Sequence, residues 1–144
     1  MNIEHFRKLE NLYHKAPTNE YFQPKLTISE GAAELILNIR QDFFHAANAV
    51  HGAYYFKALD DSAFFAANSL VDDVFVLTAN FNLHLLRPVS SGQIIARATV
   101  VSRTKNTLLA DAICFDSQEN QIARGTGSFV KSNILLTKDI GYIM

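Results

Sequence analysis

Apolar residues recur at helical spacing in two segments of the chain. Near the N-terminus the spacing predicts a helix over residues 1–16, which ends where Pro17 disfavours helical geometry in the residue before it. From Ala53 to about Leu70 helical spacing returns, in a segment that is apolar around most of its circumference. Because a helix of that kind has no face suited to water, we expect the rest of the protein to enclose it.

Most of the remaining chain has the pattern of β-strands. Residues 24–40 predict two short strands on either side of Gly31. Residues 74–89 alternate, with apolar odd-numbered positions on one side and the even-numbered positions, Thr78 among them, on the other. Three further strands are predicted at Gln93–Arg103, Thr107–Asp116 and Gln121–Lys131, joined by short polar connections that suit antiparallel hairpins.

These patterns together predict one α+β domain, in which an antiparallel sheet wraps around a long central helix and an extra helix precedes it. The core of the domain is expected to span residues 24–131, and residues 132–144 form a tail. An open sheet leaves strand edges that invite pairing, so we expect a homodimer or a dimer of dimers.

The composition of the chain argues against several classes of function. The chain has 144 residues, a hydrophobic fraction of 49% and a net charge of −1. It therefore has enough apolar material for one packed core, and its scattered basic residues predict no nucleic-acid partner. The single cysteine, Cys114, leaves too few thiols for a zinc cluster, so no metal is expected. No run approaches the roughly 20 apolar residues of a membrane span, so we expect a cytoplasmic protein with no membrane partner.

Two adjacent carboxylates interrupt the apolar central helix. Asp60 falls in line with the most apolar stripe of the helix at about 100° per residue, and an aspartate is rarely buried without a reason. Asp61 lies one helical turn from Lys57, so these two residues can form an ion pair. For Asp60 two interpretations stay open here: a structural carboxylate bonded to its neighbours, or a catalytic group.

The start of the same helix favours the catalytic interpretation. His51 and Gly52 lie where backbone N–H groups lack partners within the helix and where the helix dipole is positive. Such an end can hold a polarised carbonyl oxygen, and a glycine lets a substrate approach the backbone closely. Helix rise separates this end from Asp60 by roughly 13 Å. We therefore expect a site that combines Gly52 of one subunit with Asp60 of its dimer partner.

This arrangement resembles that of the hotdog-fold acyl-CoA thioesterases, specifically the phenylacetate-pathway-like (PaaI-type) group. That family shows His-Gly-Gly at the start of the central helix and Leu-x-Asp with the aspartate nine residues after the histidine, and here His51-Gly52-Ala53 and Leu59-Asp60 stand at matching spacing. The segment Thr78–Pro88 resembles the family strand that ends in Arg-Pro before a glycine-containing turn. The resemblance runs from about residue 27 to residue 131.

The resemblance implies roles for several residues. The backbone N–H of Gly52 polarises the thioester carbonyl, with His51 beside it, and Asp60 serves as general base or nucleophile. Thr78 matches a position where a hydroxyl can orient the attacking water. No cofactor is implied.

The sequence departs from the family pattern at three places. Ala53 replaces the second glycine, which narrows the entrance but keeps the backbone donor. Six residues before the histidine, where the family often has asparagine, this chain has His45, and Asn48 lies only three before; both are candidates to line the site. Alignment on Asp-Ser-Ala-Phe would move the catalytic role to Asp61, but the helical-face argument favours Asp60.

The primary hypothesis is therefore a cofactor-independent hydrolase of an acyl-CoA or a similar acyl thioester. The alternative is a hotdog protein that binds an acyl thioester without turnover, as a sensor or scaffold. A hydratase or dehydratase of the same fold is less attractive, because the sequence has no His-Phe-Pro active-site segment.

Overall fold

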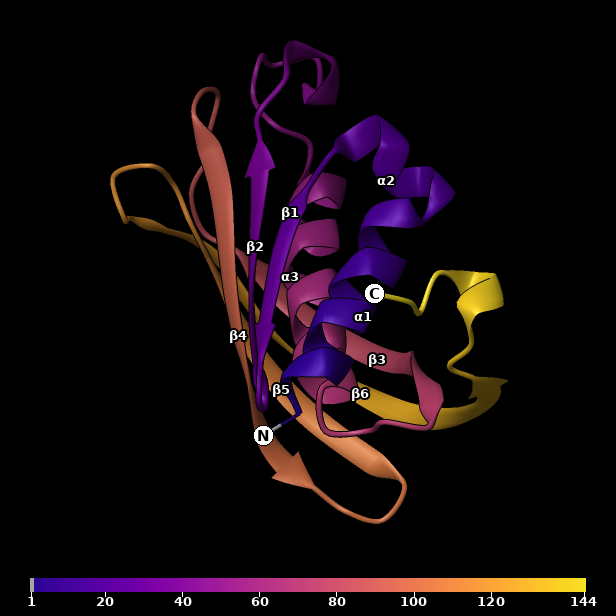
Figure 1. The fold of residues 1–144 in the computed structure, drawn as a ribbon. Coiled ribbons are helices and arrows are strands. Elements are labelled where there is room, and N and C mark those ends of the chain that lie inside the picture. Colours follow the sequence, from indigo (N-terminus) through magenta and orange to yellow (C-terminus); the bar gives the residue numbers. More distant parts are fainter. Residues whose placement is uncertain (1) are drawn as a thin grey trace.

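Residues 2–144, which the computed structural model describes, form one antiparallel sheet wrapped around a central helix, as predicted (Figure 1). The helices are α1 (Ile3–Lys15), α2 (Pro17–Phe22) and α3 (Gly52–Asn68), with single 3-10 turns η1 (Gln41–Phe43) and η2 (Lys138–Ile140). The strands are β1 (Lys25–Ser29), β2 (Ala32–Asn38), β3 (Val74–Leu85), β4 (Gln93–Arg103), β5 (Thr107–Phe115) and β6 (Gln121–Leu135). The spatial order of the strands is β1-β2-β4-β5-β6-β3, so β1 and β3 are the two edges.

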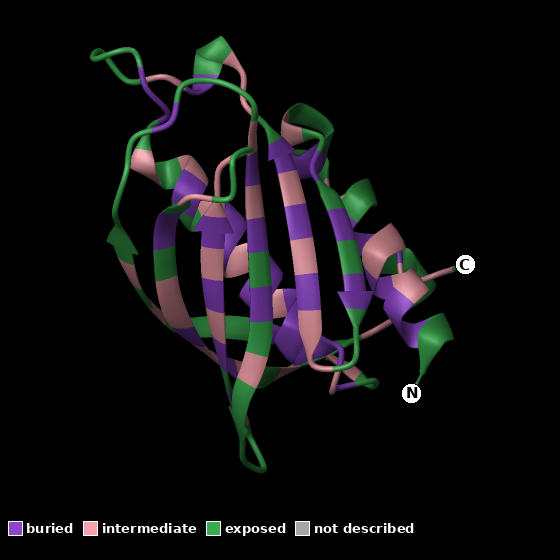
Figure 2. Ribbon diagram, turned by 90° about the vertical axis from the view of Figure 1, so that its left-hand side faces the viewer, coloured by how far each residue is buried: buried purple, intermediate pink, exposed green. Residues whose placement is uncertain are grey.

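The helix α3 lies along the concave face of the sheet, and its sequence explains why the sheet can close around it. Its sheet-facing residues are fully buried, and most of them are alanines, which let the strands approach the helix axis closely. They are Ala58, Leu59, Ala63, Ala66 and Ala67. Figure 2 shows the matching pattern on the strands, where buried positions alternate with intermediate or exposed ones because successive strand residues face opposite sides.

The edge strand β3 contains a bulge that the sequence pattern did not reveal. Thr78 pairs with Phe129 of β6 and Asn80 pairs with Ser128, so Ala79 is an extra residue between two consecutive pairs. A bulge reverses the alternation of side chains beyond it. The prediction of one uninterrupted alternation over this strand is therefore wrong.

The bulge decides where Thr78 points. Its partner Phe129 is fully buried, so Thr78 faces the helix side of the sheet together with the buried Val76. Beyond the bulge the helix side is taken by Phe81 and Leu83, which pack against the core. Simple alternation would place Thr78 and Phe81 on opposite faces of the sheet. Because of the bulge, both side chains face α3.

The N-terminal helix is followed by a second helix that the sequence analysis missed. The first helix was expected to end before Pro17, and α1 does end at Lys15, but Pro17 then occupies the first turn of α2. Proline is well tolerated there because that position has no intrahelical bond to lose. The C-terminal segment returns to α1, so both ends of the chain lie on the same side of the sheet (Figure 1).

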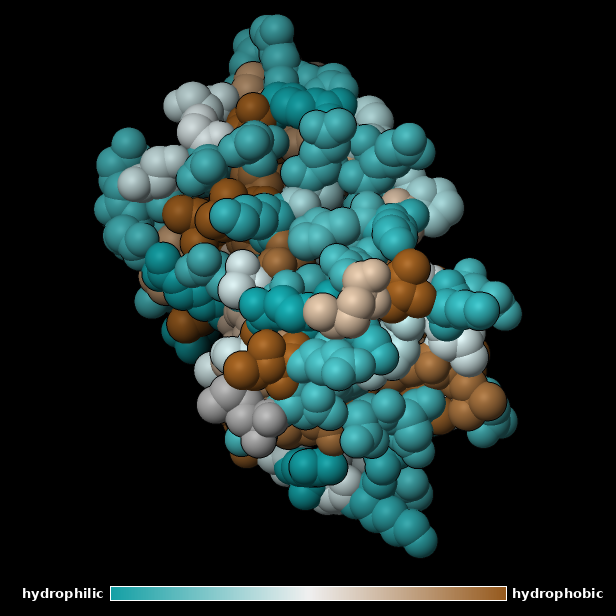
Figure 3. Space-filling view, viewed as in Figure 1, coloured by the Kyte–Doolittle hydropathy of each residue, from teal (hydrophilic) through white to brown (hydrophobic). Residues whose placement is uncertain are grey.

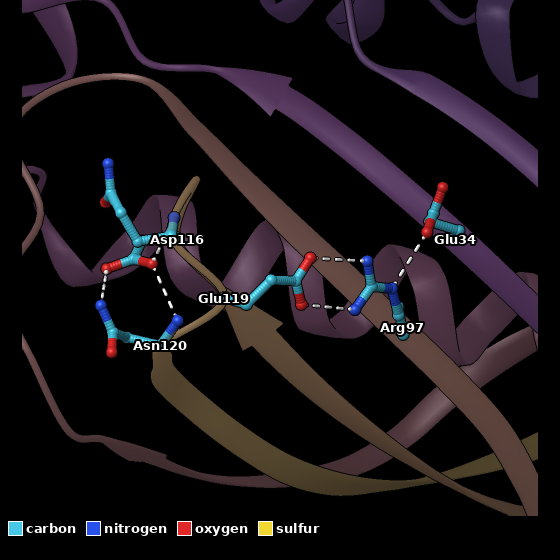
Figure 4. Close-up of polar contacts among 6 residues, drawn as sticks. Glu34, Arg97, Asp116, Glu119 and Asn120 are labelled. Atoms are coloured by element: carbon cyan, nitrogen blue, oxygen red, sulfur yellow. Dashed lines mark hydrogen bonds and ion pairs between the residues drawn. The ribbon is translucent and has the colours of Figure 1, made fainter.

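The outer face of the sheet is held by exposed ion pairs far from α3. Arg97 of β4 bonds both carboxylate oxygens of Glu119, at 2.9 and 3.1 Å, and reaches Glu34 of β2 at 3.0 Å (Figure 4). In the turn before β6, the carboxylate of Asp116 accepts hydrogen bonds from Asn120. These contacts tie the β5–β6 turn to the neighbouring strands.

Candidate active site

Asp60 lies in the middle of α3, half-buried, and bonds the strand that carries the bulge. The hydroxyl of Thr78 donates a hydrogen bond of 2.9 Å to Oδ1 of Asp60. Burial raises the pKa of Asp60 to about 6; the neighbouring charge of Asp61 adds to the rise, while the Thr78 hydrogen bond and the charge of Lys57 oppose it. The carboxylate is thus a base whose pKa lies close to neutrality.

Asp61 has a different environment from its neighbour. Its Oδ2 accepts a hydrogen bond of 2.6 Å from the hydroxyl of Tyr13 and lies 2.8 Å from Nζ of Lys57. The predicted pair of Asp61 with Lys57 is therefore confirmed. Burial and the charge of Asp61 raise the pKa of Tyr13 above its ordinary range. Asp61 thus fastens α1 to α3 through contacts that occupy its carboxylate.

The start of α3 is shaped by His51 and Gly52. Nδ1 of His51 accepts a hydrogen bond of 3.0 Å from the backbone N–H of Ala53, so His51 is the N-cap of the helix. Within residues 2–144, no acceptor lies in reach of the Gly52 N–H, which leaves it as the free donor of this end. A Cβ added at Gly52 would lie 2.7 Å from Cδ1 of Leu85, so the backbone packs closely against the end of β3.

A pocket of about 330 Å³ adjoins Gly52. It is lined by His45, Val50, Gly52, Tyr55, Leu85, Leu86, Arg87 and Pro88. Of the two candidates for an orienting contact, the structure places His45 in this lining. Asn48 instead has a φ of 65°, a left-handed conformation that asparagine tolerates, and it shapes the preceding turn.

Asp60 borders a second pocket, of about 190 Å³, which is formed by α1, α2, α3 and β3. Its lining has no residue in common with the pocket at Gly52. One chain therefore brings together Asp60, Asp61 and Thr78 at one place, and His45, His51, Gly52 and Ala53 at another. The strand β3 runs past both, with Thr78 at the first and Leu85 at the second.

Sequence reasoning missed Tyr13 and Leu85, which shape these two places. Tyr13 matched the apolar spacing of the first helix, and nothing in that pattern marks its hydroxyl as the partner of Asp61. Leu85 matched the apolar side of its strand, and its contact with Gly52 depends on tertiary packing.

Comparison with known proteins agrees with this architecture. The family model described as Thioesterase superfamily matches residues 47–123. A "Putative esterase" of Sulfurisphaera tokodaii is 28% identical over 100 residues, which cover 69% of this chain and 74% of the relative. A putative esterase of Saccharolobus solfataricus is 23% identical over 103 residues, which cover 72% of this chain and 69% of the relative.

Solved structures share the fold closely. The E. coli PaaI protein from the phenylacetic acid degradation operon superposes with a TM-score of 0.85 at 17% identity, covering 94% of this chain and 99% of PaaI. A putative esterase of Mycobacterium tuberculosis gives 0.77 at 22% identity, covering 81% and 97%.

The fold is thus the hotdog fold, with Asp60 and Gly52 at two separate places beside β3. The chain belongs to the thioesterase superfamily, because the family model covers more than half of it. The family and its relatives support hydrolysis of a thioester or ester. In residues 2–144, no helix is long and apolar enough to cross a membrane.

Proposed function

We propose that the protein hydrolyses an acyl-coenzyme A or a similar acyl thioester, with Asp60 as the general base. The observation that carries the proposal is the half-buried Asp60 carboxylate, held by Thr78 and bordering a pocket. A base with a pKa of about 6 is largely ionised at neutral pH yet basic enough to accept a proton from water.

Each group has a part in the reaction. Asp60 removes a proton from a water molecule as its oxygen attacks the thioester carbonyl, and the Thr78 hydroxyl positions the carboxylate and the water. The oxygen of the tetrahedral intermediate is stabilised by the Gly52 N–H at the positive end of α3. Collapse breaks the C–S bond, and the thiolate takes up the proton, which gives a free acid and a thiol.

A second copy of the chain completes the site in this proposal. The outer edge of β3 is exposed, and four large apolar side chains beside it are also exposed: Phe56, Leu77, Leu85 and Leu86. Exposed apolar side chains beside a free strand edge support pairing with another β3. We therefore propose a homodimer, which can associate further into a dimer of dimers.

The two candidate places lie toward opposite ends of β3. Thr78 pairs with Phe129 and Leu85 with Ala123, so the bulged strand separates them by six ladder positions, or about 20 Å. If the two β3 edges pair antiparallel, the Leu85 end of the partner's strand runs towards Thr78. Both side chains face the helix side, so the partner's Gly52 would come close to Asp60.

Free-thiol release from a panel of acyl-CoA thioesters tests this function. Asp60→Asn, which keeps an acceptor for Thr78, should lower kcat by about a hundredfold or more, the usual contribution of a positioned base. Asp61→Asn is the matched control one residue away, and its activity should stay within about tenfold of the wild type.

Two outcomes would contradict the proposal. If Asp61→Asn is the inactive variant, the catalytic role belongs to Asp61. If the wild type binds acyl-CoA tightly and releases no thiol from any substrate, the protein is a sensor or scaffold.

A further inference from the structure

The pocket at Asp60 continues into a larger groove. The larger groove has a volume of about 640 Å³ and shares Leu12, Ala16 and Phe75 with the pocket that contains Asp60. The two hollows therefore meet at these three residues. We call the combined space the terminal groove, because α1, α2 and the C-terminal segment form most of its walls.

The walls of the terminal groove are mainly apolar beyond Asp60. Phe64 lies one helical turn after Asp60 and contacts Phe75, with ring centroids 4.9 Å apart. The far part adds Pro17, Ile134, Ile140 and Ile143, together with the charged Lys15, Lys138 and Asp139. Figure 3 shows hydrophobic side chains on the right-hand side of the molecule, where the C-terminal segment and the end of β6 lie.

The C-terminal wall is held in place by specific contacts with α1. Nδ1 of the buried His5 lies 2.7 Å from the Tyr142 hydroxyl, and the Asn11 amide donates a hydrogen bond of 2.8 Å to the carbonyl of Ile143. Gly141 has a φ of 95°, and an added Cβ there would lie 3.2 Å from Cα of Leu12. The segment is therefore fixed as a wall opposite α1.

The polar side chains near Asp60 do not interrupt this path. Lys57 and Asp61 bond each other, and Tyr13 also bonds Asp61, so their polar groups are already paired. A substrate that reaches Asp60 with its carbonyl needs apolar cover for the chain beyond that carbonyl. The terminal groove provides mainly apolar cover from Asp60 to the C-terminal segment.

We propose that the terminal groove binds the acyl chain of the substrate and that Ala16, at the junction, determines the accepted chain length. This inference rests on the proposed function. A groove that extends past Phe75 to the C-terminal segment fits a medium- to long-chain aliphatic acyl group, and a single small acyl group would leave most of it empty. Each methylene that the groove covers should raise kcat/KM by about threefold to fourfold until the groove is filled.

The first test is the chain-length profile of thiol release with acetyl-, hexanoyl-, dodecanoyl- and palmitoyl-CoA. The wild type should prefer the longer chains. Ala16→Leu narrows the junction and should lower kcat/KM by about tenfold or more for dodecanoyl-CoA, with a smaller loss as the chain shortens. Ser29→Leu, an exposed change on β1, is the control. A uniform loss at all chain lengths, or an unchanged profile, would overturn the inference.

The second test measures binding of the acyl chain to the terminal groove in a variant that cannot hydrolyse it. Because Cys114 is fully buried, a cysteine introduced as Ile140→Cys can be labelled selectively with bimane in an Asp60→Asn background. The non-hydrolysable thioether dodecyl-CoA should change the bimane fluorescence, and ethyl-CoA should not. No response to dodecyl-CoA would overturn the inference even if hydrolysis is normal. If the wild type hydrolyses none of the thioesters, the proposed function fails, and the bimane response still decides whether the groove binds the chain.

Discussion

The two edge strands of the sheet, β1 and β3, differ in how far other elements of the chain cover their backbone. At the β1 edge, α1 supplies polar side chains to the strand backbone. Arg7 donates to the carbonyl of Ile28 at 2.7 Å, Glu10 accepts from the N–H of Ile28 at 2.7 Å, and His14 accepts from the N–H of Leu26 at 3.1 Å. The β1 edge is therefore closed by the chain itself.

Within residues 2–144, side-chain cover of the β3 edge is confined to its first residues, where the Asn68 amide donates to the carbonyl of Val74 and accepts from the N–H of Val76. Farther along the strand, exposed apolar side chains lie beside it. Both places of the proposed site adjoin this edge, Asp60 through Thr78 and Gly52 through Leu85. In the proposed dimer, the edge closed by the chain contributes to stability, whereas the open edge lets a second copy complete the site. Changes at the two edges should therefore have different effects.

The largest expected effect comes from placing a charge at the open edge. Phe56 is 40% exposed and packs against Phe81 with centroids 5.8 Å apart. Phe56→Glu would bury a charge in the proposed interface, so we expect monomers by light scattering and a loss of about a hundredfold or more in kcat, since the partner's oxyanion donor is lost. Val101→Glu, at a position 55% exposed on β4, should remain dimeric and active. A fully active Phe56→Glu monomer would contradict the comparison.

A change at the closed edge should affect stability and spare activity. Glu10→Leu removes the acceptor of the Ile28 N–H, and an unsatisfied backbone donor costs about 1–3 kcal/mol in the free energy of unfolding. Thermal melts should show a lower Tm, while kcat/KM of the folded protein stays near that of the wild type. Glu10→Gln keeps an acceptor and should lose less stability. Lost activity at unchanged Tm would be the contrary result.

At the open edge, the ionised carboxylate of Asp60, the proposed general base, should lower the free energy of unfolding at a pH above its pKa. The folded pKa of Asp60, about 6, exceeds the ordinary value of 3.8, so ionisation opposes folding above pH 6. Discounted for its partial exposure, the cost is about 1–2 kcal/mol. Asp60→Asn should therefore be more stable than the wild type in urea at about pH 8, and the difference should close as the pH falls through 6 towards 3.8. A less stable Asp60→Asn at the higher pH would refute this.

The smallest effect is expected from Thr78. Its hydrogen bond lowers the pKa of Asp60, so Thr78→Val should move the acid limb of kcat/KM to higher pH. A pH–rate profile of the two proteins measures the shift, with Thr99→Val, exposed on β4, as the control. A limb that moves to lower pH would show that Thr78 does not stabilise the ionised carboxylate.

Much of the fold could be predicted because the hydrophobic pattern is strong. The enclosed central helix and the strands after Gly92 follow from periodicity and turn residues alone. The bulge at Ala79 could not be predicted, since Ala79 fits the alternation and the extra residue exists only relative to its partner strand. The helix after Pro17 was missed because the proline was interpreted only as the end of the preceding helix.

The sequence predicted the contacts of the candidate site that are local in the chain, but not those that are tertiary. The spacing of Lys57 and Asp61 along one helix is a local property, so their pairing followed from the sequence. The contacts of Thr78 with Asp60 and of Leu85 with Gly52 are tertiary. They depend on how β3 crosses α3, which no local pattern encodes.

Subunit mixing tests the shared site most directly. Gly52→Pro removes the proposed N–H donor and is compatible with the first turn of a helix, and His51 already has a ψ of 141°, which suits the residue before a proline. Gly52→Ala introduces the same Cβ contact with Leu85 and keeps the N–H, so it is the control and should retain more activity. Asp60→Asn and Gly52→Pro should each be nearly inactive as homodimers.

In a mixture of these two variants, each heterodimer holds one intact site, built from Asp60 of one subunit and Gly52 of the other. After dissociation and reassembly of equal amounts, thiol release should recover to about a quarter of the wild-type rate, because half of the dimers are mixed and each has one of two sites. A mixture that stays inactive after confirmed subunit exchange would contradict the account, because the two groups would then not act across the dimer.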